Sequence, residues 1–447
     1  MSQNRKIILT IPLFCLVIFI GGPTFANQAD KLKNELTPTG AIRAGNSNNT
    51  IPPWHDLSKS QQKKMASVLS QEAPLDIIDS TNYHQYASQL SDGLIEMFQH
   101  YPDTFKMKVY PTHRTATMPN WYYQGTYKNV SDALLSADGE EIIKAWPGIT
   151  FPIPDTPKKI MWNHQTRWAG ISISAIAIEA TVNTQGKYNL IENSLVGYSS
   201  INNPNRGITF ASWRGGYYLS KIISPSRLAG GALLIHATLS PLKHPRQAWI
   251  YIPAQRRARR APTVSYDAPT STSEGIRVMD ELNMYNGALD RYDWFLIGKK
   301  EMLIPYNNNA LKAQLNDEKH ILTPYHINPE FGRYELHRVW IIKATLKKSK
   351  KHLYKQRVFY IDEDSWSILM VENYRHTNEL WRLSLRHQAY SHELPGLATV
   401  ADIYHDLDNK KYFIQGFRPN AWVYSNTAPD KRKFTPKTLA QFANDKK

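Results

Sequence analysis

Residues 256–260 read RRARR and place four arginines within five positions. Guanidinium groups at this density commonly bind polyanions such as nucleic acid, heparin or anionic lipid, because arginine forms bidentate hydrogen bonds with phosphate and carboxylate. The run just before them, RQAWIYI, is apolar and aromatic, which is typical of a buried strand. The arginines are therefore either a binding patch or part of a folded hairpin.

Strand geometry separates these arginines into two pairs. Residues 253–255 form a connection of hairpin length, so we expect the chain to turn there and return as a second strand. Side chains alternate between the two faces of a strand. Arg256 and Arg260 then face one way, and Arg257 and Arg259 face the other. The RRARR run is not predicted to form a single cationic patch.

Two interpretations of the arginine pairs remain open. In the first, one pair forms ion pairs with the acid-rich stretch 265–294 and the other pair is solvated, an arrangement that contributes little free energy. In the second, the inward pair lies at the mouth of a cavity and binds a phosphate or carboxylate headgroup. Trp249, Tyr251 and Trp294 are the candidate lining of such a cavity, although aromatic residues on strands more often belong to an ordinary core.

No residue spacing predicts a catalytic centre or a metal site. His337 and His352 are separated by a lysine-rich loop at a spacing that metal ligands do not use. His164 lies in an aromatic helix and is interpreted as a buried, hydrogen-bonded structural residue. The acidic run 362–364 is interpreted as a solvated turn. We predict no catalytic residue, metal or cofactor; a hydrolase of hydrophobic substrates is the remaining enzymatic alternative and needs a nucleophile, a base and an orienting group in one cleft.

The first 26 residues predict a secretory signal peptide. A basic start precedes an apolar core, and Thr24 and Ala26 provide small residues for cleavage; an uncleaved anchor is the alternative. The single cysteine, Cys15, lies in this segment, so the mature chain would have no disulfide. Cleavage lowers the formal charge from +16 to +14, which favours anionic partners. We expect a periplasmic protein with no later transmembrane segment and no nucleic-acid partner.

Composition and periodicity predict an α+β, mostly β fold. Apolar residues at three- and four-residue steps predict one helix within 84–102, and a further short helix is expected over 131–146. From residue 170 onward, alternating β-branched and aromatic runs separated by short loops predict a large antiparallel sheet that must curl. The expected organisation is a signal peptide (1–26), an extended N-terminal arm (27–56), a helical part (57–169), the curved sheet (170–425) and a charged C-terminal tail (426–447), with 27–447 forming one structural unit.

Several ordered motifs resemble a known family. They include ELTPTGAIRAGN (35–46), MKVYPTHRTATMP (107–119), FPIPDTPKKIMWNHQTRW (151–168), PRQAWIYIPAQRRARRAP (245–262) and GALDRYDWFLIGKKEMLIPYN (287–307). The chain is identified as a member of a large uncharacterised bacterial family of secreted domains of unknown function, labelled outer-membrane lipoprotein-sorting-like. Through Trp249, Tyr251 and Pro253 it also resembles, more distantly, the lipoprotein carrier LolA.

The resemblance implies a fold and a function class. It implies a strongly curved antiparallel sheet, an incomplete LolA-like β-barrel, with helices packed on its concave side. It also implies a periplasmic, non-enzymatic carrier or binding protein for a lipid, lipoprotein acyl chains or another hydrophobic cargo, working with an envelope exporter of the resistance-nodulation-division type or another outer-membrane partner. The alternative is an accessory or structural subunit that docks on such an exporter without carrying cargo.

Overall fold

The computed structural model describes residues 25–206, 214–261 and 265–445. The predicted signal peptide lies outside these residues except for its last two positions. Within the described ranges, no helix combines the length and the hydropathy needed to cross a bilayer.

The helices begin at residues that favour helix N-termini. Ser58 and Gln61 form a reciprocal capping box at the start of α2, and a threonine followed by proline starts both α5 and α7 (Thr156 and Thr435 are the caps). The α-helices are α1 (Phe25–Lys31), α2 (Lys59–Gln71), α3 (Asp92–His100), α4 (Asn120–Asp132), α5 (Pro157–Thr166), α6 (Asn309–Gln314) and α7 (Pro436–Asn444).

Among the described residues, sixteen strands form one sheet, and two more form a separate hairpin. The long strands match the alternating runs of the sequence. The strands are β1 (Asp76–Ile78), β2 (Met107–Val109), β3 (Leu134–Leu135), β4 (Ile142–Lys144), β5 (Ser172–Val182), β6 (Ile191–Ser199), β7 (Arg214–Ser224), β8 (Ala232–Thr238), β9 (Gln247–Ile252), β10 (Arg257–Arg260), β11 (Tyr292–Pro305), β12 (Tyr334–Leu346), β13 (Gln356–Asp362), β14 (Ile368–Tyr374), β15 (Leu380–Ser391), β16 (Gly396–Asp406), β17 (Lys411–Phe417) and β18 (Val423–Ser425).

The sheet joins two series of antiparallel strands. The order is β1-β2-β12-β13-β14-β15-β16-β17-β5-β6-β7-β8-β9-β10, with β11 on β12 and β18 on β5. The contact between β17 and β5 connects the two series, although more than 200 residues separate Phe413 from its partner Thr181. A single parallel bridge links β2 to β12. Since β10 ends the order and pairs only with β9 among the described strands, the sheet is open at that end.

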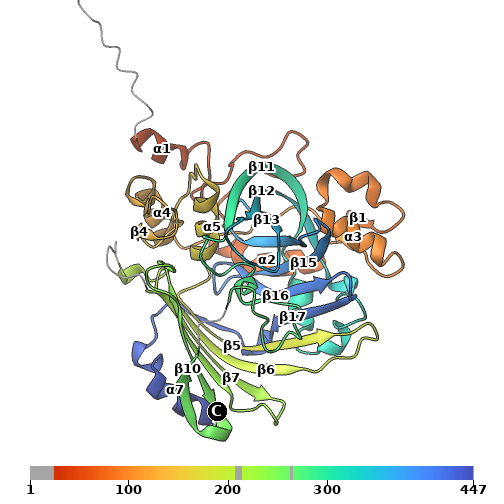
Figure 1. Cartoon of the computed structure of the whole chain (residues 1–447). Coiled ribbons are helices and arrows are strands. Elements are labelled where there is room, and N and C mark those ends of the chain that lie inside the picture. The colour runs from red at the N-terminus through yellow and green to blue at the C-terminus, as the bar shows by residue number, and fades with distance from the viewer. Residues whose placement is uncertain (1–24, 207–213, 262–264, 446–447) are drawn as a thin grey trace, which may run out of the picture.

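Register shifts explain why this long sheet curves. They occur in several pairs, including Leu296/Gly298 in β11 and His387/Gln388 in β15. An extra residue on one strand bends that strand and increases its twist. Gly298 has φ 145°, a value that a residue with a side chain rarely adopts. The predicted mostly β fold with an open, curved antiparallel sheet is therefore confirmed (Figure 1).

Helices and loops cover the sheet in separate regions. Leu94, Met97 and Phe98 of α3 belong to one core cluster with β11–β15, and Ile160 and Trp162 of α5 belong to another that includes buried residues of β12–β14. At the other end of the strand order, α7 packs on β7–β10, as Figure 1 shows for the strands that extend away from the rest of the sheet.

Two local predictions are wrong. The expected helix within 84–102 is interrupted: a 3₁₀ helix, Tyr83–Gln89, ends before α3, because the Ser91 side chain accepts a hydrogen bond from the Leu94 amide and starts a new helix. The expected helix over 131–146 is instead the β3–β4 hairpin. Gly139 turns that hairpin with φ 75°, which disfavours a continuous helix.

Candidate functional site

The β9–β10 hairpin carries the RRARR run at the open end of the sheet. Pro253–Gln255 forms a 3₁₀ turn, and Arg256 closes it in the left-handed conformation with φ 49°. Arg256 therefore belongs to the turn, whereas Arg257 begins β10. The predicted hairpin is present, but Arg256 does not pair with Arg260 on one strand face as expected.

One face of this hairpin is covered by α7. Trp249 and Tyr251 lie on that face, and Arg260 stands opposite Trp249 in the register. Tyr251 is buried, and its hydroxyl accepts a hydrogen bond of 3.2 Å from the Asn444 side chain at the end of α7. The backbone oxygen of Phe434, just before α7, lies 2.8 Å from Nε2 of His236, whose ring packs edge-on against Trp249. Trp249 and Tyr251 thus belong to the surface on which α7 packs.

The opposite face, which we call the arginine face, carries isoleucines and arginines together. Arg257 stands opposite Ile252, and Arg259 stands opposite Ile250. Ile250 is 41% exposed, and both arginines are exposed. Within the described residues, neither guanidinium group takes part in an ion pair. Directly opposed residues in an antiparallel pair lie on the same face with close side chains, so the edge strand places two free cations beside an apolar surface.

The apolar surface of the arginine face extends across the neighbouring strands. Ile250 pairs with Leu233 on β8, which pairs with Ser220 on β7, then Leu195 on β6 and Ala175 on β5. Leu195 and Ala175 are buried in a small cluster with the partly buried Tyr218. The surface therefore passes from a buried part at β5–β6 to an exposed part at β9–β10.

The acid-rich stretch covers the same sheet face farther along, over β13–β17 and β5. Arg277 donates a hydrogen bond of 3.0 Å to the Gln415 side chain and stacks over Phe413. The backbone oxygen of Glu281 accepts a hydrogen bond of 2.9 Å from the Tyr404 hydroxyl. This part of the sheet is therefore covered by protein, whereas Ile250, Arg257 and Arg259 are exposed at the β9–β10 end.

The acids of this stretch pair with other cations than the RRARR run. Asp280 contacts Arg357 at 3.0 Å and His352 at 3.1 Å, and Asp290 contacts Lys350 at 2.9 Å. The interpretation in which one arginine pair of the RRARR run forms ion pairs with stretch 265–294 is therefore wrong for the described residues.

Trp294 does not lie with the other two predicted aromatic residues on β9. It is on β11, where its ring packs edge-on against Tyr285 and Tyr292. Its indole N–H donates a hydrogen bond of 2.8 Å to the Leu289 carbonyl. Trp294 is 9% exposed, and in this position it stabilises the buried stretch that precedes β11.

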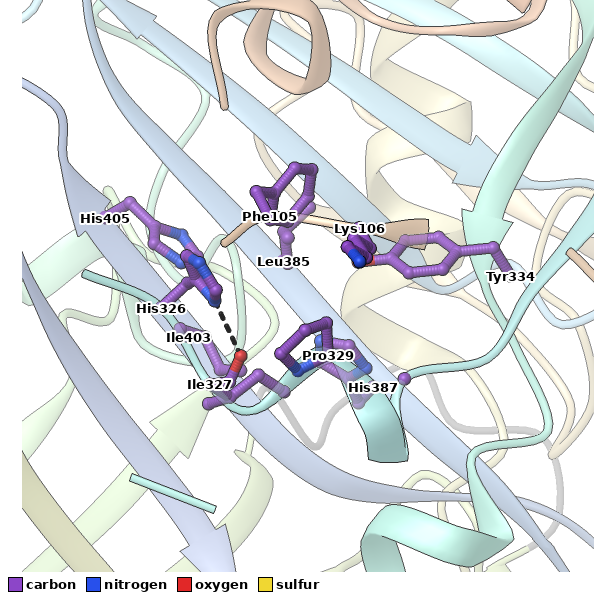
Figure 2. A pocket seen from close by; sticks show the side chains of 11 residues that line it. Phe105, Lys106, His326, Ile327, Pro329, Tyr334, Leu385, His387, Ile403 and His405 are labelled. Carbon is purple, nitrogen blue, oxygen red and sulfur yellow. Dashed lines mark hydrogen bonds between the residues drawn. The ribbon is translucent and has the colours of Figure 1, made fainter. Parts of the chain in front are cut away.

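A small pocket lies on the other face of the sheet. It has a volume of about 20 Å³, and Phe105, Tyr334, His326, His387 and His405 are among its lining residues (Figure 2). Burial lowers the pKa of His387 to about 4 and that of His405 to about 3, so both rings are neutral near pH 7. A volume of this size accommodates about one water molecule and no acyl chain.

Two further sequence interpretations are settled by hydrogen bonds and burial. His164 is a structural residue as predicted: its Nδ1 accepts from the Ile368 amide at 2.9 Å, and its Nε2 donates to the Asn283 carbonyl at 2.9 Å. The acidic run is not a solvated turn, because Asp362, Glu363 and Asp364 are 0%, 2% and 3% exposed. The interpretation of that run as solvated is therefore wrong.

Sequence reasoning missed the contributions of Ile250 and Ile252. They alternate with Trp249 and Tyr251 along β9 and so lie on its opposite face, whereas the candidate lining named from the sequence held aromatic side chains alone. The signal was available in the tail, since PKTLAQFAN carries apolar residues at helical spacing. A segment of this kind needs an apolar surface to pack on.

The comparisons with known proteins cover nearly the whole chain. A model of the family described as protein of unknown function, DUF1329, matches residues 77–440. The uncharacterized protein PA3922 of Pseudomonas aeruginosa is 37% identical over 459 residues, which cover 98% of this chain and 99% of that protein.

Solved structures give weaker similarities. A DUF1329 family protein from Desulfovibrio piger has 14% identity and a TM-score of 0.43, covering 63% of this chain and 96% of its own. A putative outer membrane lipoprotein-sorting protein domain from Vibrio parahaemolyticus has 14% identity and a TM-score of 0.43, covering 63% and 97%. The LolA superfamily protein NE2245 from Nitrosomonas europaea has 11% identity and a TM-score of 0.38, covering 63% and 98%. The family match and the full-length similarity to the Pseudomonas protein confirm the predicted membership: the chain belongs to the DUF1329 family.

Proposed function

We propose that this protein is a periplasmic binding or carrier protein for an anionic amphiphile, a molecule with an acyl chain and a phosphate or carboxylate headgroup. The observation that carries the proposal is the β9–β10 register, which sets Arg257 against Ile252 and Arg259 against Ile250 on the exposed edge strand. The acyl chain lies on Ile250 and Ile252 and on Leu233 of the neighbouring strand β8. The headgroup lies at the two arginines.

The energetics favour such a ligand over a purely charged or purely apolar one. Burial of an acyl chain contributes about 0.8 kcal/mol per CH₂, so a chain that covers a few exposed side chains supplies most of the affinity. Exposed guanidinium groups add bidentate hydrogen bonds to phosphate or carboxylate oxygens. The overall formal charge of +16 supports the attraction of anionic molecules.

A fluorescent fatty acid, 11-(dansylamino)undecanoate, and its methyl ester test the two parts of the ligand separately. The variant Arg257→Gln/Arg259→Gln is expected to lower the affinity for the acid by about tenfold or more, which corresponds to about 1.4 kcal/mol. Its affinity for the ester should be unchanged. Ile250→Asp is expected to lower the affinity for both the acid and the ester. The matched control Arg256→Gln/Arg260→Gln removes the same charge from the turn and from the α7-covered face, and should leave both affinities unchanged.

Two results would contradict the proposal. Wild-type protein that binds neither probe, together with preparations from cells that contain no organic-extractable ligand by mass spectrometry, would exclude a binding role. Equal losses in the two double arginine variants would show that net charge, and not the arginine face, determines affinity. An exporter or outer-membrane partner stays a prediction, and co-purification in mild detergent tests it.

A further inference from the structure

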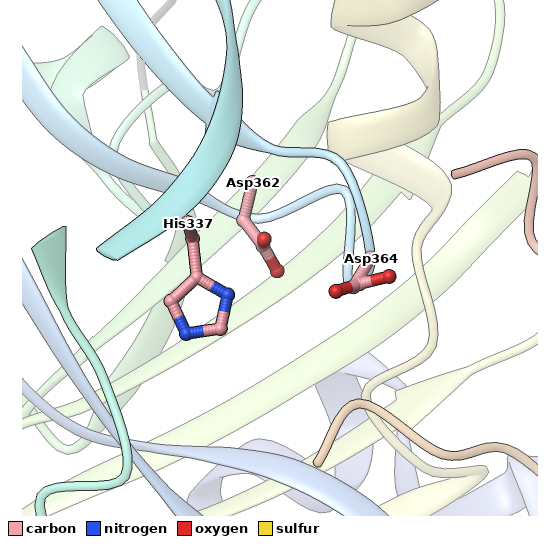
Figure 3. A group of neighbouring side chains, drawn as sticks. All are labelled: His337, Asp362 and Asp364. Carbon is pink, nitrogen blue, oxygen red and sulfur yellow. The ribbon is translucent and has the colours of Figure 1, made fainter. Parts of the chain in front are cut away.

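A histidine and two aspartates lie together beneath the N-terminal arm. His337 is on β12, Asp362 is the last residue of β13, and Asp364 lies in the turn toward β14. All three are buried, and one potential metal-ligating atom from each lies within 4.8 Å of the others (Figure 3). Neither an ion pair nor a hydrogen bond connects His337 to either aspartate in the described chain. Proximity without direct bonding is the arrangement expected around a shared cation.

The His337 ring is held with one nitrogen facing the aspartates. Its Nε2 lies 3.2 Å from a Glu335 carboxylate oxygen, and Glu335 is itself held by Arg333 at 2.6 Å and by Asn307 at 3.0 Å. A carboxylate can only accept, so Nε2 donates its N–H to Glu335 and Nδ1 is the ring nitrogen left for a metal ion. Figure 3 shows this second nitrogen turned toward Asp362. Metal-binding histidines are commonly oriented by a carboxylate on the far nitrogen in this way.

Asp362 has one oxygen without a partner. Its Oδ2 accepts hydrogen bonds from the Ser365 amide at 2.9 Å, the Ser365 hydroxyl at 2.6 Å and the Tyr306 hydroxyl at 3.2 Å. Its Oδ1 is buried and forms no hydrogen bond with a described residue. A buried carboxylate oxygen without a partner is costly, since the desolvation of the charge is not offset.

Asp362 also differs from the neighbouring carboxylates in its charge environment. Arg114 binds Asp364 through Nε at 2.9 Å and Nη2 at 2.7 Å, and Lys299 lies 2.8 Å from Glu363. No described Lys or Arg forms an ion pair with Asp362.

We propose that His337 Nδ1, Asp362 Oδ1 and an Asp364 oxygen bind one divalent transition cation, with Zn²⁺ as the best chemical match. One imidazole nitrogen and two carboxylate oxygens suit Zn²⁺ or Mn²⁺, whereas Ca²⁺ and Mg²⁺ prefer oxygen alone. Zinc binds such ligands at roughly 2.0–2.2 Å, so tetrahedral ligand atoms lie about 3.4 Å apart, and the three side chains close in from separations of up to 4.8 Å. Arg114 stays bound to Asp364, and the His337 nitrogen favours Zn²⁺ over Ca²⁺ and Mg²⁺.

The position of this site gives the cation a structural role. Arg114 also donates hydrogen bonds to the arm carbonyls of Ile42 at 2.8 Å and Arg43 at 3.3 Å. Trp366, in the same turn as Asp364, donates from its indole N–H to the Thr39 carbonyl at 2.9 Å. A cation at this turn would fix the extended N-terminal arm to β12–β14. This inference is independent of the ligand-binding role proposed above.

The experiment is refolding of the full chain with and without ZnCl₂, because a buried site takes up metal most readily as the chain folds. After desalting, bound zinc is measured by mass spectrometry, and Co²⁺ is substituted as a spectroscopic probe. Wild-type protein is expected to retain one zinc per chain and to gain thermal stability. His337→Gln and Asp362→Asn are expected to lose at least 100-fold in zinc affinity.

The control is His352→Gln, which removes a second buried histidine that also contacts a carboxylate, Asp280 at 3.1 Å. It should retain zinc as the wild type does. Circular dichroism confirms folding of each variant, and the Co²⁺ spectrum of the wild type tests the site even where one variant does not fold. Wild-type protein that retains no Zn²⁺, Co²⁺ or Mn²⁺, or a His337→Gln variant that retains as much zinc as the wild type, would overturn the inference.

Discussion

The Asp280 carboxylate forms an ion pair of 3.0 Å with the Arg357 guanidinium, although 77 residues separate them in the chain. Both side chains are buried, and Nε of Arg357 also donates a hydrogen bond of 2.9 Å to the Asn373 side chain. The pair joins the acid-rich stretch to β13 and thereby holds the stretch over the part of this sheet face that lies away from the arginines.

Removal of one partner of this ion pair should strongly destabilise the fold. Asp280→Asn leaves Arg357 buried without its counter-charge, and we expect a loss of about 3–5 kcal/mol in the free energy of unfolding. Urea denaturation measures it. The control Asp30→Asn removes an ion pair with Lys33 in which both side chains are 62% exposed, and its effect should be below about 1 kcal/mol. Equal effects at the two sites would contradict the structural role of Asp280.

Stability should fall as the pH is lowered below 6.5. The folded-state pKa values of His387 and His405 are about 4 and about 3, below the ordinary value of about 6.5. The unfolded chain therefore binds protons that the folded chain excludes. Each histidine is expected to lower the free energy of unfolding by about 1.4 kcal/mol per pH unit, from pH 6.5 down toward its folded pKa.

Replacement of one of these histidines tests that pH dependence. His405→Gln removes one group that takes up a proton on unfolding. The slope of the free energy of unfolding against pH, measured by urea titrations between pH 6 and 4.5, should therefore decrease. His84→Gln, at an exposed position, is the control and should leave the slope unchanged. An unchanged slope in His405→Gln would contradict the expected contribution of this residue.

One substitution in α7 should unfold this helix locally and leave the main sheet folded. Leu439 is fully buried between α7 and β7–β10, and Leu439→Ala is expected to cost about 2–5 kcal/mol of local packing. Hydrogen exchange should then show lost amide protection in Pro436–Asn444, while β12–β16 keep theirs. Loss of protection in both regions together would show that α7 and the main sheet unfold as one unit.

Salt should weaken the binding of an anionic amphiphile through the arginine face. Exposed charges are screened within about 3 Å at 1 M salt and about 10 Å at 0.1 M. We therefore expect the affinity for 11-(dansylamino)undecanoate to fall several-fold between low and high salt in the wild type. Arg257→Gln/Arg259→Gln should show a nearly flat dependence. A salt dependence that persists in this variant would assign the electrostatic attraction to other residues.

One glycine-to-alanine change in a helix should destabilise the protein, against the usual trend. Alanine exceeds glycine in helix propensity by about 1 kcal/mol. At Gly125 in α4, however, a Cβ would lie 1.7 Å from the Pro147 carbonyl oxygen. Gly125→Ala should therefore lower the melting temperature by several degrees in differential scanning calorimetry. Ser131→Ala, at an exposed position of the same helix, should leave it nearly unchanged.

Local sequence signals predicted most of the sheet. The alternating runs predicted at 171–182 and 337–346 lie in β5 and β12, because a strand with one buried face imposes a period of two. The strand β6 was missed because its residues Glu192, Asn193 and Ser194 lack an apolar alternation. The helix expected over 131–146 failed at Asp138-Gly139, a dipeptide typical of hairpin turns.

The sequence by itself determined the family, the hairpin and the two-sided distribution of Arg257, Arg259 and Arg260, since each depends on motifs or on alternation within a few residues. Only the tertiary structure decided which acid meets which arginine. It assigned Asp280 to Arg357 and left Arg257 and Arg259 beside Ile252 and Ile250. It also buried Asp362 and Asp364 next to His337. These outcomes depend on contacts between distant segments, and the free energy of such contacts comes from burial that no local pattern encodes.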